Sequence, residues 1–481
     1  MKKIVISKLF LYRYRFVIGY VVLGLAFAVL LLILPVVAQN GLSEAEIESA
    51  TTSYYLGREG ILGGDLVDLP YRILQKLSIT IFGLSAYSVK LPSVMIGLLL
   101  GFLLILLLNR WFKSNVSLLA SCLVVLSTPF LFLAGSGTPL IMLVFWPTLL
   151  LWLGSKIQGE KRPKPLYSFA FAIAMLLSIL TPYMIYFAVF CVLFVLSQPH
   201  LRFIIKNLPK LPLTLVGIIL LVGFGLIGFN LIQTPQVIME LLFAKNFEGG
   251  HFLHNIKDGL VPMFSWRNSV EGVFLSPLIG LPTFMLALIG LFSTTKGFFA
   301  SRNSIASILI VFCLVITGFN PNAIVFLILP LSILIAHGLK YVLEKWYGLF
   351  PENPYARISA ILPLSILFGI IILPNLLQYV YGYRYNPNTA DVFNYDLAII
   401  KSHLKDENLL VKEHFDFYRI LEDSTNLRVV DSFEAGGKIA TLGKPEIVPE
   451  GYQLERIITS PMRDNSDIIY LYTAEAIKEG E

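Results

Sequence analysis

Residues 84–108 decide the fold: they read LSAYSVKLPSVMIGLLLGFLLILLL, and Lys90 is the one charged residue among them. A helix that crosses a lipid bilayer needs about 20 predominantly apolar residues, so this stretch is long enough to span it. Ten further apolar runs lie at 16–38, 115–134, 139–155, 166–182, 183–198, 213–232, 272–293, 305–319, 323–341 and 360–382. The sequence therefore predicts a polytopic α-helical membrane protein with about eleven transmembrane helices.

The composition excludes the possibility that the whole chain is one large water-soluble domain. Of the 481 residues, 56% are hydrophobic and 14% are charged, whereas soluble domains carry about 25% charged residues. Residues 1–382 hold 26 Lys and Arg against 13 Asp and Glu, while residues 383–481 hold 11 against 18. We therefore predict a basic transmembrane domain over 1–382 and an acidic soluble domain over 383–481.

The loops between the apolar runs predict the orientation in the membrane. With the N-terminus inside, the inside segments carry 19 Lys and Arg and the outside segments carry six. Basic residues concentrate in cytoplasmic loops, so this split favours a cytoplasmic N-terminus and an extracytoplasmic C-terminal domain in a multi-pass protein of the cell membrane. The same rule explains the basic charge without a nucleic-acid partner.

The C-terminal domain has the pattern of a small α/β unit. Its predicted helices are Asp391–Leu404 and Phe415–Leu421, and its predicted strands are Leu409–Lys412, Leu427–Val430, Ile457–Thr459 and Asp467–Tyr472. It shows no catalytic constellation. We expect it to cover the outer site or to bind the acceptor or the cell wall.

The segment 39–83, called here the first outer loop, holds six of the thirteen acidic residues that precede residue 383. Ser43 followed by Glu46 is a capping box, which predicts a helix start, and Gly57 is a natural stop. A second helix is predicted from Asp68 to Gly83. Its apolar face is typical of a helix in the membrane interface, and we expect its polar residues, Arg72, Gln75 and Lys76, to face water.

The residues around these helices resemble a known family. Pro70-Tyr71, Phe82-Gly83-Leu84-Ser85 and Val89-Lys90-Leu91-Pro92-Ser93 follow an acidic first loop. This arrangement resembles the C superfamily of glycosyltransferases (GT-C), and within it the protein mannosyltransferase and aminoarabinose transferase type. The resemblance covers residues 10–110 by motif and the other spans by layout.

The resemblance implies a GT-C-like fold and a hexosyl- or pentosyltransferase. The donor would be a polyprenyl-phosphate-linked sugar, and the acceptor an extracytoplasmic protein, lipid or cell-envelope glycan. A carboxylate would remove the proton of the acceptor hydroxyl, and a cation would stabilise the departing phosphate. A single displacement would invert the anomeric centre.

The chain departs from the family pattern at two places. The Asp of the family's Asp-Glu pair falls on Ala45 and its Glu on Glu46, with Glu44 one residue early. The segment 320–326, before Pro330, has no cation where family members often carry one. The candidate catalytic residues are therefore Glu44 and Glu46, and the candidate substrate-binding residues are Arg58, Asp65, Arg72, Lys90 and Arg267.

Each candidate also has a structural explanation. Acids in the first turn of a helix are favoured by its dipole, which applies to Glu44 and Glu46. Asp65 follows two glycines in a turn sequence, Lys90 near a span end can reach the interface, and Arg267 lies beside an aromatic-belt tryptophan. No metal ligand set is predicted, and a divalent cation such as Mg²⁺ or Mn²⁺ stays open as a cofactor.

Two other functions stay open. A non-catalytic scaffold or lipid-binding protein with the same fold is favoured by Ala45 and by the cation-free segment 320–326. A transporter is disfavoured, because ion-coupled carriers usually place carboxylates or paired charges at mid-membrane, and the apolar runs contain no such group.

Overall fold

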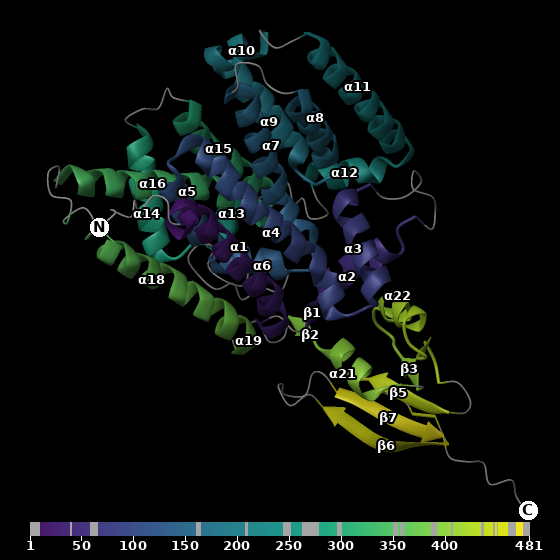
Figure 1. Ribbon diagram of the computed structural model, residues 1–481. Helices are drawn as coiled ribbons and strands as arrows, with labels where there is room; N and C mark the ends of the chain where they lie inside the picture. The colour runs from purple at the N-terminus through teal and green to yellow at the C-terminus, as the bar shows by residue number, and fades with distance from the viewer. Residues whose placement is uncertain are drawn as a thin grey trace, which may run out of the picture.

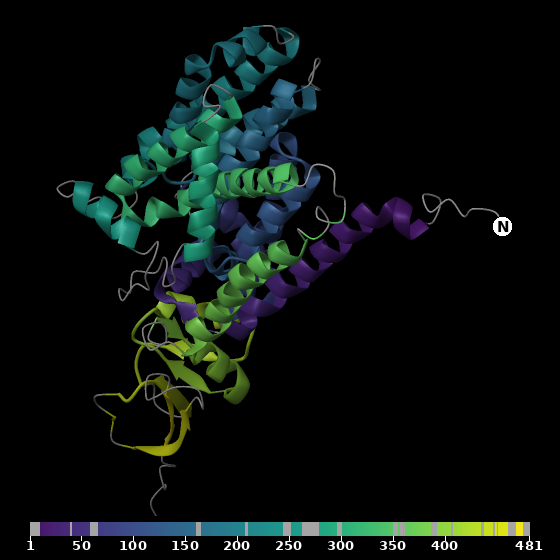
Figure 2. The ribbon, with the colours of Figure 1, turned by 90° about the vertical axis from the view of Figure 1, so that its left-hand side faces the viewer.

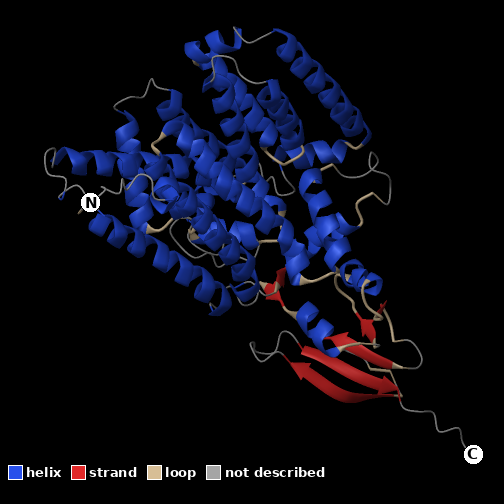
Figure 3. Cartoon of the chain, in the orientation of Figure 1, coloured by secondary structure: helices blue, strands red, loops and turns tan. Residues whose placement is uncertain are grey.

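The computed structural model describes residues 10–38, 41–57, 66–159, 165–206, 210–243, 252–261, 279–295, 301–349, 355, 359, 361–385, 392–405, 407–433, 437–445, 448–449, 451–459 and 468–474. These residues form a large helical body with a smaller sheet-containing unit at one end (Figure 1). Helices make up nearly all of the body, and the larger sheet belongs to the C-terminal unit (Figure 3).

The helical body contains most of the predicted membrane segments. Its helices are α1 (Phe10–Ala38), α4 (Ala86–Trp111), α5 (Ser114–Val125), α6 (Thr128–Gly135), α7 (Met142–Gly159), α8 (Pro165–Ile179), α9 (Met184–Ser197), α10 (Pro199–Lys206), α11 (Lys210–Gln233), α12 (Pro235–Phe243), α13 (Phe252–Leu260), α14 (Leu281–Thr295), α15 (Ser301–Phe319), α16 (Ile328–Leu349), α18 (Ile361–Leu377) and α19 (Tyr383–Tyr385). Short 3₁₀ turns lie at Pro139–Ile141 and Pro321–Leu327, and a π-helical turn lies at Gln378–Gly382.

Each of the eleven apolar runs overlaps a helix. Five helical stretches of the described residues are long and apolar enough to cross a membrane, namely Ala86–Trp111, Pro139–Gln158, Leu213–Ile232, Ala323–Leu349 and Leu362–Gly382. The bent pair of α5 and α6, with a 65° break, makes a sixth if it is one span. Five shorter apolar stretches coincide with the remaining runs. The total of eleven crossings stays a prediction.

Close backbone contact holds α14 and α16 together. A side chain at Gly290 would overlap the carbonyl oxygen of Leu334, and one at Gly338 would overlap that of Leu286. Small residues allow membrane helices to approach until their backbones touch. Glycine at both crossing points therefore explains why this pair packs so tightly.

The C-terminal unit contains a five-stranded mixed sheet. The strands are β3 (Asn408–Leu410), β4 (Arg428–Val430), β5 (Lys438–Leu442), β6 (Tyr452–Thr459) and β7 (Ile468–Ala474), in the order β4-β3-β5-β7-β6. The pairs β3–β4 and β3–β5 are parallel, while β5–β7 and β6–β7 are antiparallel. Two helices accompany the sheet, α21 (Asp396–His403) and α22 (Phe415–Arg419), followed by the 3₁₀ turn Ile420–Asp423. All four predicted strands are present, and the central strand β5 was not predicted.

The first outer loop carries α2 (Glu44–Tyr54) and α3 (Leu69–Phe82), and it packs directly on the C-terminal unit. Strand β1 (Leu42–Ser43) pairs with β2 (Phe393–Asn394) in an antiparallel sheet. One buried hydrophobic cluster includes Ile47 and Ile79 from the loop together with Ile400 and Tyr418 from the C-terminal unit. The two views of the ribbon agree on this contact (Figure 2). The loop is therefore held between the helical body and the sheet unit.

One expectation for α3 is wrong. Its apolar residues Ile73, Leu77 and Ile81 are exposed, whereas Gln75, which we expected to face water, is fully buried. A helix at a membrane interface turns its apolar stripe towards lipid, so its polar residues face the protein. The helix begins after Asp68 as predicted, but the Asp68 side chain makes no capping hydrogen bond.

Candidate functional site

The start of α2 places Glu46 inside the protein. The predicted capping box is confirmed, since Ser43 Oγ accepts from the Glu46 N–H at 3.4 Å and Glu46 Oε2 accepts from the Ser43 N–H at 2.8 Å. Glu46 is 1% exposed. Glu44, two residues earlier on the helix, is exposed. The two candidate carboxylates therefore face different surroundings, and only Glu46 points into the body.

Glu46 has two further partners there. Its Oε1 accepts a 2.5 Å hydrogen bond from the backbone N–H of Gly137, and Lys90 Nζ lies 3.7 Å from its Oε2. Both side chains of this ion pair are 3% exposed or less. A buried carboxylate needs such partners, because an isolated charge in a low-dielectric interior is strongly unfavourable.

Lys90 is positioned by the beginning of α4. Ser85 and Ser88 form a capping box that starts this helix. Lys90 Nζ donates to the carbonyl oxygen of Gly41 at 2.7 Å and lies 5.4 Å from the ring centroid of Phe393. The ammonium group thus joins the first outer loop, α4 and the segment that leads into the C-terminal unit. It lies within the protein and does not reach for the interface.

A tight turn at Gly137 closes the other side of the pair. The backbone of this turn receives a 2.8 Å hydrogen bond from Gln75 Nε2, which also donates to the Val89 carbonyl at 3.1 Å. A Cβ at Gly137 would lie 2.7 Å from Val89 Cγ1. Only glycine therefore allows this backbone to approach α4 and to donate its N–H to Glu46.

Two buried tyrosines lie near the ion pair. Tyr71 Oη lies 2.8 Å from Ser93 Oγ, and Tyr71 is fully buried. Burial raises the pKa of Tyr71 well above its ordinary value, and the charges of Glu46 and Asp68 raise it further. Tyr379, also fully buried, has a hydroxyl with no hydrogen-bond partner among the described residues. The site thus contains a carboxylate, an ammonium group and neutral phenols together with buried serine and glutamine side chains, all away from solvent.

The other predicted site residues are placed differently. Arg72 is half-buried on α3. Arg58, Asp65 and Arg267 lie outside the described residues. Over the part of the chain that the structure describes, no three His, Cys, Asp or Glu side chains come together as a metal site. A divalent cation therefore stays a prediction.

Sequence reasoning missed Gly137, Gln75, Tyr379 and Phe393. The turn sequence Ser136-Gly137-Thr138-Pro139 between two apolar runs was the one local signal available for the first of these. Gln75 was assigned to the wrong face of its helix. Nothing in the local sequence brings Phe393, some 300 residues away, to Lys90.

Comparison with known proteins identifies the fold. Residues 71–225 match the family described as dolichyl-phosphate-mannose-protein mannosyltransferase. The crystal structure of ArnT from Cupriavidus metallidurans bound to undecaprenyl phosphate matches with 14% identity over 94% of this chain and 98% of that chain, at a TM-score of 0.56. The apo state of the same protein matches with 15% identity over 95% and 98%, also at 0.56.

More distant matches add little. The apo oligosaccharyltransferase of Archaeoglobus fulgidus has a TM-score of 0.47 and 11% identity, over 86% of this chain and 65% of that chain, which is too remote to support an argument. A search of curated protein sequences finds no match. The structural match to ArnT nevertheless spans nearly the whole of both chains. It confirms the resemblance that was predicted from residues 10–110. This chain has the fold of the GT-C superfamily of membrane glycosyltransferases.

Proposed function

We propose that this chain is a membrane glycosyltransferase that moves a sugar from a polyprenyl-phosphate donor to an acceptor outside the membrane. The fold and the family match over 71–225 support the reaction class. The donor class is supported by ArnT, which has the same fold and was crystallised with undecaprenyl phosphate. The acceptor would reach the site from the side of the first outer loop and the C-terminal unit.

The buried pair of Glu46 and Lys90 is the observation that carries the proposal. It brings one carboxylate and one ammonium group within 3.7 Å of each other near the N-terminal ends of α2 and α4. Transfer from a lipid-linked phosphate needs the same two charges, a base for the acceptor and a cation for the leaving phosphate. Because the pair is buried away from water, both electrostatic effects are stronger than they would be in solvent.

The proposed reaction is a single displacement. The donor phosphate replaces Glu46 as the partner of Lys90, which leaves the carboxylate able to accept a proton. The acceptor hydroxyl oxygen then attacks the anomeric carbon, and its proton passes to Glu46. The bond between the anomeric carbon and the phosphate oxygen breaks with its electron pair on that oxygen, where Lys90 stabilises the negative charge. One such displacement inverts the anomeric centre.

The test uses purified full-length protein with a labelled polyprenyl-phosphate sugar and measures transfer and donor binding separately. We expect Glu46→Gln to lower turnover by about 10²- to 10⁴-fold, the usual contribution of a general base, while undecaprenyl phosphate still binds. Lys90→Met should weaken that binding. Glu48→Gln is the matched control, because Glu48 is exposed on the same helix. Transfer by Glu46→Gln at the wild-type rate would exclude Glu46 as the base.

The exposed Glu44 provides an internal comparison. If it supplies the base, as the one-residue shift of the family motif would allow, Glu44→Gln loses turnover and Glu46→Gln keeps it. The burial of Glu46 beside Lys90 leads us to expect the reverse.

A specific observation also favours a second function, a non-catalytic lipid-binding protein. Both carboxylate oxygens of Glu46 already accept hydrogen bonds, from Ser43 and Gly137. Under this alternative the pair only supports the fold. Wild-type protein would then transfer no sugar, Glu46→Gln would lower the melting temperature, and undecaprenyl phosphate would still raise it.

A further inference from the structure

A separate cavity of about 320 Å³ lies at the far end of the helical body from the first outer loop. Helix α4 shows the separation, because it begins at Ala86 beside the loop and contributes its last residue, Trp111, to the cavity wall. At 1.5 Å per residue the two ends of this helix are about 38 Å apart. The cavity is therefore distinct from the Glu46–Lys90 site.

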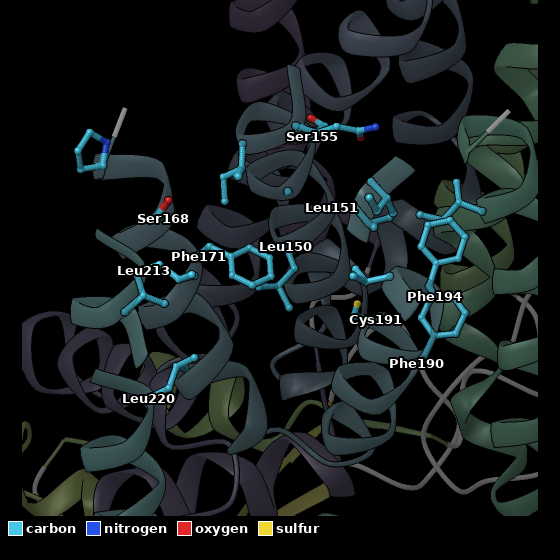
Figure 4. Close-up of a pocket in the computed structure, with 18 of the residues that line it drawn as sticks. Leu150, Leu151, Ser155, Ser168, Phe171, Phe190, Cys191, Phe194, Leu213 and Leu220 are labelled. Carbon is cyan, nitrogen blue, oxygen red and sulfur yellow. The ribbon is translucent and has the colours of Figure 1, made fainter. Parts of the chain in front are cut away.

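The walls are almost entirely hydrocarbon. Helices α7, α8, α9 and α11 contribute Leu150, Phe171, Phe194, Leu213 and Leu220, among other apolar side chains (Figure 4). Leu213 and Leu220 are two turns apart on α11, so the cavity extends about 10 Å along this helix. A narrow apolar space between membrane helices is suited to an acyl chain and not to a polar substrate.

Polar groups gather at one end of this space. In Figure 4 the hydroxyls of Ser155 and Ser168 lie towards one end and Leu220 towards the other. The end with the serines is also where α7 finishes, α8 begins and the short helix α10 follows α9. The cavity therefore has an apolar depth and a polar mouth, as a lipid requires.

Three cations lie next to residues at this end, one by a hydrogen bond and two by sequence. Arg110 Nη2 donates to the carbonyl oxygen of Ser155 at 3.2 Å. Lys156 directly follows Ser155 on α7, and Arg202 directly follows the lining residue Leu201 on α10. The described residues 142–159 and 165–206 contain no Asp or Glu, and Glu160 lies outside the described residues. Lys and Arg close to a membrane surface attract anionic lipid headgroups.

We propose that this cavity binds an anionic phospholipid, with one acyl chain between α7, α8, α9 and α11 and the phosphate at Arg110, Lys156 and Arg202. The predicted orientation places the site in the cytoplasmic leaflet. The lipid would fill the space between α11 and its neighbours and so stabilise the helical body. This role does not depend on the proposed transferase reaction.

Gly154 allows a direct test, because it lines the cavity and a Cβ there would meet nothing within 4 Å. Gly154→Leu should fill the space without a clash. Gly217→Leu is the matched control, since Gly217 also has open space around it but lies outside the lining. The readouts are native mass spectrometry of bound lipid and the rise in melting temperature on adding phosphatidylglycerol. We expect Gly154→Leu to lose both and Gly217→Leu to keep both; equal behaviour of the two variants would overturn the site.

The headgroup claim has its own test, which compares phosphatidylglycerol with phosphatidylcholine of the same acyl chains. Wild-type protein should prefer the anionic lipid, and Lys156→Gln and Arg202→Gln should each reduce that preference about fivefold. Lys405→Gln, on the exposed surface of the C-terminal unit, should leave it unchanged. Equal affinity of wild-type protein for both lipids would refute the anionic headgroup. Displacement of the bound lipid by undecaprenyl phosphate in wild-type protein, but not in Gly154→Leu, would instead assign the cavity to a polyprenyl chain.

Discussion

At the scale of single residues, the charge pair of Glu46 and Lys90 is the main determinant of the site. Each group is held by hydrogen bonds to backbone atoms, Glu46 by the N–H groups of Ser43 and Gly137 and Lys90 by the carbonyl of Gly41. Such bonds fix the positions of both charges whether or not they react. The pair can therefore support the fold and also preorganise a site, and the two roles make different predictions.

The structural role predicts non-additive losses of stability. Removing one partner of a buried ion pair costs about 3–5 kcal/mol, because the other charge stays buried without compensation. We expect Lys90→Met and Glu46→Gln each to lower the melting temperature in detergent. The double variant should lose less than the sum, since neither charge remains, and a double-mutant cycle measures the difference. Strictly additive losses would show that the two charges do not stabilise each other.

Gly137 gives a second prediction at this scale. A methyl group there would press against Val89 at 2.7 Å, so Gly137→Ala must displace either α4 or the turn that donates to Glu46. Overpacking of this kind costs about 1–3 kcal/mol. We expect a lower melting temperature, measured against Gly225→Ala, where a Cβ meets nothing within 4 Å. Equal stability of the two variants would mean that the turn adapts freely.

At the scale of elements, local patterns predicted more than contacts between distant segments. The apolar runs and the capping box at Ser43 follow from periodicity and capping chemistry within a few residues, and the structure has helices over all the runs and the capping box at Ser43. Strand β5 was not predicted, although Gly436-Gly437 before it and Gly443 after it are turn signals; its five residues, KIATL, form only a short apolar run that begins with a lysine. The approach of Phe393 to Lys90 depends on tertiary packing, which no local signal encodes.

The α14–α16 pair provides the element-scale prediction. Gly290→Ala would place a methyl group onto the Leu334 carbonyl, and Gly338→Ala would do the same at Leu286. Because backbone atoms cannot move aside as a side chain can, we expect both variants to yield little folded protein. Size-exclusion profiles in detergent check this, with Gly369→Ala on α18 as the control, since its Cβ meets nothing within 4 Å. Normal yields of both variants would show that the two helices separate at little cost.

At the scale of the whole molecule, the first outer loop connects the helical body to the C-terminal unit. It pairs with the unit through β1 and β2, and Tyr55 Oη donates to the carbonyl oxygen of Asp416 at 2.9 Å. The loop also carries Glu46, which bonds to the body at Gly137. The position of the site is therefore coupled to the docking of a unit that contributes few residues to it.

Because of this coupling, we expect a destabilising substitution in the core of the C-terminal unit to release the first outer loop from its buried position. Ile400 is buried, at 0% exposure, in the core that the first outer loop and the C-terminal unit share. Ile400→Asp would therefore bury an unpaired charge and detach the unit. Leu454→Asp is the matched control, because Leu454 is 48% exposed on β6.

The readout is maleimide labelling of a cysteine introduced by Ala50→Cys, because Ala50 on α2 is buried in the same core. The three native cysteines, Cys122, Cys191 and Cys313, are replaced by serine so that only the new cysteine reacts. We expect fast labelling with Ile400→Asp and slow labelling with Leu454→Asp. Slow labelling in both variants would mean that the loop holds its place on the helical body without the unit, because contacts such as Gln75 with Gly137 and Lys90 with Gly41 suffice.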